Sequence, residues 1–134
     1  MPEIYYEIPI QAPAEKCFEA ITSESKISEW WLPNSKFIAL EGSIGTFPFP
    51  DGRGQIRMKV EEINPQRKLV WRCLEHKHQD WINTIVTFEI VSEADGTCLL
   101  RFTHSGWKDK SETFGRVSYF WAAAYLSKLR SMLA

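Results

Sequence analysis

A histidine and a serine stand side by side in the segment FTHSGW, residues 102–107. In hydrolases such a pair supplies a nucleophile and its base, provided that the two side chains meet and a carboxylate orients the base. Neighbouring side chains on a strand point to opposite faces, so His104 and Ser105 point apart if the segment is extended. No G-x-S-x-G elbow supports the serine. The pattern therefore disfavours a Ser–His hydrolase.

Two interpretations of His104 remain. In the first, it is a polar group at the mouth of a cavity, where it donates or accepts a hydrogen bond for a ligand. In the second, its ring nitrogens are satisfied by backbone or water, as buried polar groups usually are. In both, the side chain points inward and Gly106 frees the turn after the strand. His104 is also the one weak candidate for a catalytic group.

A second segment whose side chains could take part in chemistry is EHKHQD, residues 75–80. On an extended chain His76 and His78 would lie on the same side, with Glu75 or Asp80 as a further metal ligand. The segment is polar and connects two expected strands, so a solvated hairpin loop is the simpler interpretation. We therefore expect no metal and no cofactor, and His76 and His78 remain weak candidates only.

Composition indicates a soluble globular protein. The chain has 134 residues, 44% hydrophobic and 25% charged, which fits one domain over residues 1–134. A formal net charge of −1 gives no reason to expect nucleic acid or a membrane surface as a partner. The three cysteines lie inside apolar patterns, as expected of reduced core thiols. Acidic residues near the N-terminus and the lack of a membrane-length apolar run favour a cytoplasmic protein.

Aromatic residues are unusually frequent, at 13% of the chain, with six tryptophans and eight phenylalanines. Rings carry large apolar area, so they either build a bulky core or line a cavity. Small-molecule cavities are mostly apolar and aromatic, with a few polar groups that fix the ligand's orientation. We expect such a cavity, and its predicted ligand-binding residues are Trp30, Phe49, Met58, Trp71, Phe88, Phe102, His104, Trp121 and Tyr125.

Periodicity predicts the elements that would position these residues. Residues 3–10 are expected to form a strand, followed by two short helices over 13–22 and 23–31. Apolar and polar residues then alternate, which is typical of half-buried antiparallel strands. The strand candidates in this part are 36–40, 45–49, 54–63, 68–74, 82–91 and 98–104.

The last 22 residues follow a helical period. Over 112–133 one face carries Phe114, Val117, Trp121, Ala124, Tyr125, Leu129 and Met132. This is the one expected element long enough to cover the apolar face of the strands. The predicted fold class is therefore α+β, with a curved antiparallel sheet of about six or seven strands wrapped around a long C-terminal helix.

The chain resembles the START-like, or SRPBCC, helix-grip superfamily, and within it the branch named after activators of the ninety-kilodalton heat-shock chaperone's ATPase. The matching segments are IPIQAPAEKCFEAITSESKISEWW, NPQRKLVWR, TIVTFEI, DGTCLLRFTHSGW and the terminal YLSKLRSML, in the family's order. The resemblance implies a deep apolar cavity between sheet and terminal helix. Members bind lipids, sterols, polyketides or hormones, some catalyse cyclisation or dehydration, and others are chaperone cofactors or act in stress response. In YFWAAAY small alanines follow Trp121, where the family usually has leucines at helical spacing, and this changes the pocket wall.

Three functions fit these observations. The first is a module, monomeric or homodimeric, that binds a small apolar ligand such as a lipid, sterol or polyketide. The second is a protein-interaction module that activates a heat-shock chaperone, although activators with that role carry an additional domain and this chain has no room for one. The third is a cyclase or dehydratase with His104 in the cavity, joined by Glu75 if that side chain points inward. The sequence favours the binding module over an enzyme.

Overall fold

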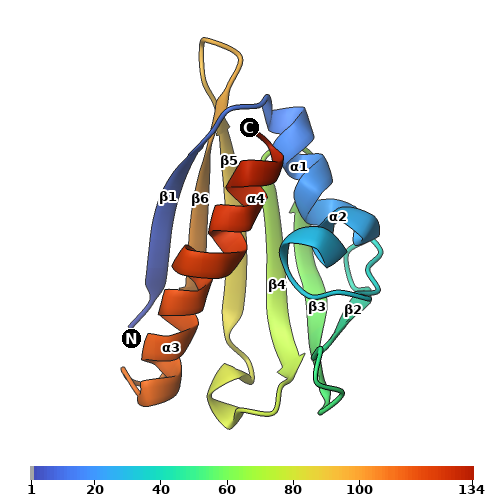
Figure 1. The fold of residues 1–134 in the computed structure, drawn as a ribbon, viewed down its shortest axis with the longest axis vertical. Helices are drawn as coiled ribbons and strands as arrows, with labels where there is room; N and C mark the ends of the chain where they lie inside the picture. Colours follow the sequence, from blue (N-terminus) through green and yellow to red (C-terminus); the bar gives the residue numbers. More distant parts are fainter. Residues whose placement is uncertain (1) are drawn as a thin grey trace.

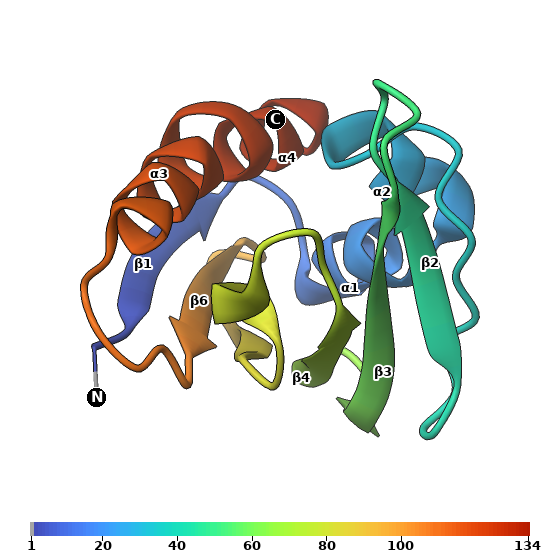
Figure 2. The ribbon, with the colours of Figure 1, turned by 90° about the horizontal axis from the view of Figure 1, so that it is seen from below.

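The computed structural model describes residues 2–134, and it folds into a six-stranded antiparallel sheet with helices on its concave side (Figures 1 and 2). The predicted α+β helix-grip architecture, with two short helices after the first strand and a long C-terminal helix, is confirmed. In chain order the elements are β1 (Ile4–Ile10), α1 (Ala14–Thr22), α2 (Glu24–Trp30), β2 (Ile44–Pro48), β3 (Gln55–Asn64), β4 (Lys68–Glu75), the 3₁₀ turn η1 (Gln79–Trp81), β5 (Ile85–Ser92), β6 (Cys98–Ser105), α3 (Glu112–Phe120), the π-helical turn η2 (Trp121–Tyr125) and α4 (Leu126–Met132).

The sheet has the order β1-β6-β5-β4-β3-β2, so the chain returns once to place its first strand beside its last. The pairing of β3 with β4 shifts register twice, between Arg57 and Met58 and between Val60 and Glu62. Such bulges bend a strand and increase its twist. In Figure 2 the sheet curves around the helices, with α3 and α4 across its open side and α1 and α2 filling one end.

The segment 36–40 is not the strand that its apolar pattern predicted. Lys36 makes one isolated bridge to Thr46, after which the chain leaves the sheet. The hydroxyl of Ser43 donates to the carbonyls of both Ile38 and Leu40, at 2.8 and 2.6 Å. Local side-chain bonds of this kind satisfy the backbone without a strand partner. The prediction of a strand was wrong because hydrogen bonds from the Ser43 side chain, and not a neighbouring strand, satisfy the backbone of this segment despite its apolar alternation.

The C-terminal helix is continuous but changes its winding in the middle. The backbone N–H of Leu126 donates to the carbonyl of Trp121, five residues earlier, so η2 holds one more residue per turn than an α-helix. This extra residue rotates the buried face. Leu126 is buried and Ala124 is exposed, contrary to the helical spacing that placed Ala124 on the apolar side. Trp121 and Leu129 are buried as predicted.

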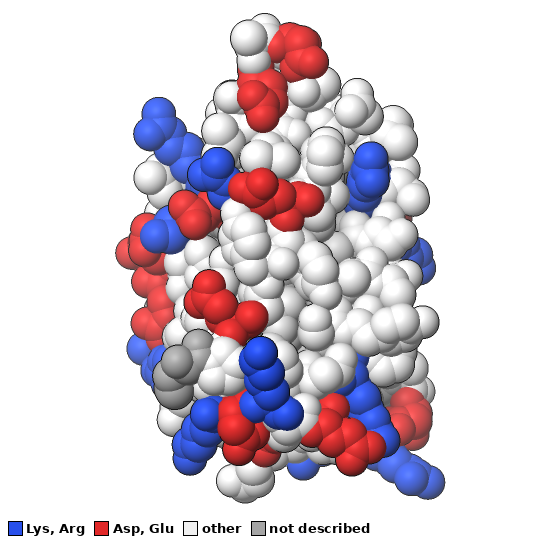
Figure 3. Space-filling view, turned by 90° about the vertical axis from the view of Figure 1, so that its left-hand side faces the viewer, with Lys and Arg blue, Asp and Glu red and all other residues white. Residues whose placement is uncertain are grey.

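Charged side chains are interspersed on the face shown in Figure 3, where acidic and basic groups lie side by side without a large area of one sign. Some form ion pairs across strands, such as Arg101 with Glu7 at 3.0 Å and Arg72 with Glu61 at 2.8 Å. Within residues 2–134, no helix is both long and apolar enough to cross a membrane.

Gly106, directly after β6, occupies a left-handed conformation with φ of +89°. A Cβ added there would lie 3.2 Å from the Cα of Thr84, closer than ordinary contact. We expect Gly106→Ala to lower the free energy of unfolding by about 2–3 kcal/mol, because left-handed backbone costs about 1–2 kcal/mol and crowding adds to it. Gly96→Ala is the control: its φ is +87°, and nothing lies within 4 Å of the added Cβ. If urea denaturation showed the same loss of unfolding free energy for both variants, the close approach to Thr84 would contribute nothing to the cost at Gly106.

Candidate functional site

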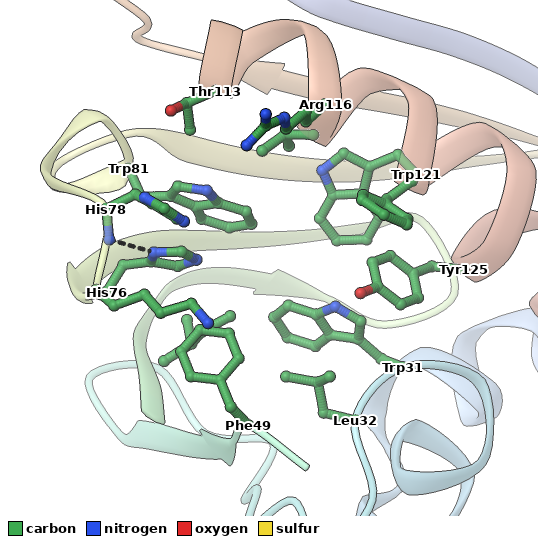
Figure 4. A pocket seen from close by; sticks show the side chains of 14 residues that line it. Trp31, Leu32, Phe49, His76, His78, Trp81, Thr113, Arg116, Trp121 and Tyr125 are labelled. Carbon is green, nitrogen blue, oxygen red and sulfur yellow. Dashed lines mark hydrogen bonds between the residues drawn. The ribbon is translucent and has the colours of Figure 1, made fainter. Parts of the chain in front are cut away.

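A pocket of about 350 Å³ lies between the first half of the C-terminal helix and the loop that joins β4 to β5 (Figure 4). Rings dominate its wall, and none of its side chains is acidic. We call it the aromatic pocket; it is lined by Trp31, Leu32, Phe49, Ile56, His76, Lys77, His78, Trp81, Thr113, Arg116, Val117, Phe120, Trp121 and Tyr125.

Three of the predicted ligand-binding residues belong to this wall: Phe49, Trp121 and Tyr125. The other six point inward, as strand and helix periodicity predicted, but lie in the packed core behind the pocket. They are Trp30, Met58, Trp71, Phe88, Phe102 and His104, and each is 0% exposed.

Trp31 separates Trp71 and Phe47 of the sheet from the pocket, whereas Ile56 of β3 reaches the wall. The ring of Trp31, at the C-terminal end of α2, stacks on Trp71 at 5.6 Å and on Trp121 at 5.6 Å. It also lies 4.6 Å from the ring of Phe47. The indole of Trp31 therefore lies between these sheet residues and the pocket. Some of the chain's many aromatic rings form the packed core, and others form the pocket wall.

Sequence reasoning missed most of the wall, although two signals were present. Trp81 was an isolated large ring in a polar loop, and the structure buries it to 6% exposure by folding the loop inward. The helix contributes Thr113, Arg116, Val117 and Phe120, which recur at the three- and four-residue spacing of one helical face. Within the segment 75–80 only His76 is half-buried, and the other five residues are exposed, as expected of a solvated loop.

His104 lies at the centre of a buried hydrogen-bond chain, which we call the His104 network. The indole N–H of Trp121 donates to its Nδ1 at 3.1 Å, and its Nε2 lies 2.8 Å from the hydroxyl of Thr84. An indole nitrogen can only donate, so Nδ1 carries no proton and Nε2–H is the donor to Thr84. The Thr84 hydroxyl in turn donates to the carbonyl of Trp81 at 2.6 Å.

This network settles the two interpretations of His104. The imidazole is neutral, and burial lowers its pKa to about 3, with a smaller contribution from positive charge on His76. Both ring nitrogens are occupied by side chains, and His104 is not part of the pocket wall. The prediction that His104 is a polar group at the cavity mouth was wrong. The interpretation of His104 as a buried histidine with satisfied ring nitrogens is correct, but its partners are the side chains of Thr84 and Trp121 and not backbone or water.

The groups that a serine hydrolase or a cyclase would need are not assembled around His104. Ser105 lies on the opposite face of β6 and is half-buried. Glu75 is exposed and lies 3.8 Å from the guanidinium of Arg57, so it does not join His104 inside. Among residues 2–134 no carboxylate forms a hydrogen bond with the imidazole, and the one hydroxyl that does, that of Thr84, donates its proton to the carbonyl of Trp81.

His76 is a pocket residue with one free donor. Its Nδ1 accepts the backbone N–H of His78 at 2.9 Å, so the proton of the neutral ring is on Nε2. The ring stacks on Trp81 at 4.2 Å, and burial, followed by charge on His78 and Lys77, lowers its pKa to about 3. Figure 4 shows its other nitrogen turned toward the interior of the pocket.

The two histidines of the loop do not form a metal centre. Their rings lie 5.5 Å apart, and the nitrogen of His76 nearest to His78 already accepts a hydrogen bond. Within residues 2–134, no cluster of three or more His, Cys, Asp and Glu side chains is placed to hold a metal ion.

Tyr125 supplies a second polar group to the pocket. Its ring comes from the end of η2, and its hydroxyl points into the pocket from the side opposite His76 (Figure 4). Burial raises its pKa, so the phenol is protonated at neutral pH. Among residues 2–134 the hydroxyl has no hydrogen-bond partner. Two donors, one from the β4–β5 loop and one from the helix, thus face a space walled by rings.

A curved antiparallel sheet gripping a long helix, with a pocket between them, defines a helix-grip domain. The model of one family of such domains, described as "Activator of Hsp90 ATPase homolog 1-like protein", matches residues 11–134. The chain therefore belongs to this family. Among curated proteins, none matches the chain.

Solved structures support the assignment. The Aha1 dimer from Colwellia psychrerythraea superposes with a TM-score of 0.87 at 26% identity, covering 99% of this chain and 96% of that one. Protein MLL2253 from Mesorhizobium loti gives 0.86 at 25% identity, covering 98% and 96%. DynU16, from the dynemicin biosynthetic locus, gives 0.79 at 16% identity, covering 98% of this chain and 46% of that one, and shows the fold alone.

Proposed function

We propose that this protein is a small-molecule-binding domain that holds a compact, largely apolar ligand in the aromatic pocket. The observation that carries the proposal is the pocket itself, because it remains open beside a core of tightly packed rings. Its volume falls in the lower part of the range of roughly 300–1,000 Å³ that is typical of ligand sites.

The composition of the wall supports the same function. Trp31, Trp81 and Trp121 offer flat apolar surfaces, and His76 and Tyr125 offer donors that would orient a ligand. Burial of each ligand methylene contributes about 0.8 kcal/mol, so affinity would come mainly from apolar contact and selectivity from the two donors. Ring compounds suit these surfaces better than extended chains.

Ligand binding can be tested by melting temperature and tryptophan fluorescence against fatty acids, sterols, flavonoids and aromatic polyketides. A ligand that binds only the native state must raise the melting temperature, and it would perturb the three tryptophans of the wall. We expect saturable changes with compact ring compounds. If no compound in any of the four classes shifted either signal, the binding function would be rejected.

Val117→Trp is expected to abolish this binding while the protein stays folded. Val117 lines the pocket from α3, is half-buried and packs at the edge of the core. A larger ring there would occupy the space that the ligand needs, and the affinity should fall at least about tenfold, an effect of about 1.4 kcal/mol. Ser131→Phe, on the exposed side of α4, is the matched control and should bind normally. Unchanged affinity in Val117→Trp would place the ligand elsewhere.

Family membership favours one second candidate, activation of a heat-shock chaperone ATPase. Three exposed side chains could contribute to such contact: Ile38 and Leu40 are each 64% exposed and Ile44 is 44% exposed. Stimulation of Hsp90 ATPase by this protein, lost in Ile38→Ser/Leu40→Ser, would establish it.

The Colwellia relative is a dimer, and size-exclusion chromatography will distinguish monomer from homodimer here.

A further inference from the structure

Hydrogen-bond donors and cations predominate among the polar side chains of the aromatic pocket. His76 presents Nε2–H, Tyr125 presents a hydroxyl, and Lys77 and Arg116 bring positive charge, while the wall holds no Asp or Glu. A ligand that matches this set carries acceptor oxygens with negative charge. On the premise that the pocket binds a small molecule, we propose that its ligand class is planar aromatic carboxylates, with the ring among the tryptophans and the carboxylate toward Lys77 and Arg116.

The two cations are held beside the pocket from opposite elements. The ammonium of Lys77 lies 4.3 Å from the centre of the Phe49 ring, a cation–π contact that keeps it over the wall. Arg116 comes from α3, and Figure 4 shows its guanidinium along the helix side of the pocket. A carboxylate between them would accept charge-assisted hydrogen bonds, which are stronger than neutral ones.

The present partners of these cations do not prevent such binding. Lys77 lies 4.0 Å from Asp51, and Arg116 pairs with Glu112 four residues earlier on the same exposed face of α3. Exposed ion pairs of this kind contribute little, so a ligand carboxylate can exchange with them at small cost. Neither Asp51 nor Glu112 belongs to the wall of the pocket.

The rings set the shape of the ligand. The indole of Trp31 stacks against Trp121 with 29° between their planes, and His76 stacks on Trp81 with 10° between their planes. Two flat surfaces of this kind favour a planar ring between or against them. The carboxylate then lies at the edge of the ring, directed toward Lys77 and Arg116.

Three naphthalene compounds of nearly equal size separate charge from shape: 2-naphthoate, 2-naphthamide and 2-(aminomethyl)naphthalene. Calorimetric titration of the full chain should give the tightest binding for the carboxylate, about tenfold tighter than the amide, and the weakest for the ammonium compound. The double variant Lys77→Gln/Arg116→Gln should lose that tenfold advantage of the carboxylate over the amide. Lys16→Gln, on the exposed side of α1, removes charge away from the pocket and should leave that advantage unchanged.

The outcomes distinguish this inference from the function on which it rests. Binding of the amide as tightly as the carboxylate, or full retention of the carboxylate advantage in the double variant, overturns the carboxylate class and leaves a neutral aromatic ligand. Failure of all three compounds to bind overturns the ligand class, and the binding function itself is rejected only if the panel of fatty acids, sterols, flavonoids and polyketides fails as well.

Discussion

Replacement of His104 by alanine is expected to lower the free energy of unfolding by about 3–5 kcal/mol, which is close to the whole stability of many small domains. The imidazole is fully buried, so its removal leaves a cavity. It also leaves the indole N–H of Trp121 without an acceptor in an apolar interior. Urea denaturation followed by far-UV circular dichroism measures the loss.

Thr84→Val provides the matched control for this effect. It keeps the shape of the side chain and removes only the hydroxyl that links His104 to the carbonyl of Trp81. We expect it to cost about 1–3 kcal/mol. Because both residues belong to one network, the double variant should lose less than the sum of the two single losses. Strict additivity would show that the two bonds are independent and that the network does not act as a unit.

Acidification is expected to destabilise the protein between pH of about 6.5 and about 3. The pKa of His104 is near 6.5 in the unfolded chain and about 3 in the folded one, because burial opposes the charged form. In that window the unfolded state binds a proton that the folded state does not, so stability falls as pH falls. The slope for one such group is about 1.4 kcal/mol per pH unit, and it vanishes above pH of about 7.

The contribution of His104 can be isolated by comparing the pH dependence of the protein with that of His104→Gln. The variant should lose the slope that belongs to one buried imidazole. His76 has a similarly lowered pKa, but it is only half-buried, so solvent reduces its share of the slope. His76→Gln should therefore flatten the curve less. If His104→Gln kept the full slope, the neutral state assigned to His104 would be wrong.

The sheet and its inward face could be predicted because they depend on local alternation. The pattern of β6 placed His104 inward and Ser105 outward before any contact was known. The same reasoning succeeded for α1 and α2, whose N-cap residues are Pro13 and Ser23, the positions at which the two helices were expected to begin.

The wall of the pocket could not be predicted, because it depends on contacts between elements distant in sequence. Nothing in the sequence around Trp31 shows that its ring will stack on Trp71 from β4 and on Trp121 from the C-terminal helix. Alternation identifies which side chains point inward, but it does not say which of them another ring will cover. Similarly, the inward fold of the β4–β5 loop depends on the stacking of His76 on Trp81.

The π-helical turn gives the C-terminal helix one residue more than ordinary winding needs. Deletion of one alanine from Ala122–Ala124 would return η2 to ordinary winding and place Leu126 four residues and Leu129 seven residues after Trp121. That is the spacing of one α-helical face, so the three side chains would stay on the buried side. The exposed alanine run can therefore lose its extra residue without turning the buried face, and relatives with this fold are expected to include chains that are one residue shorter here.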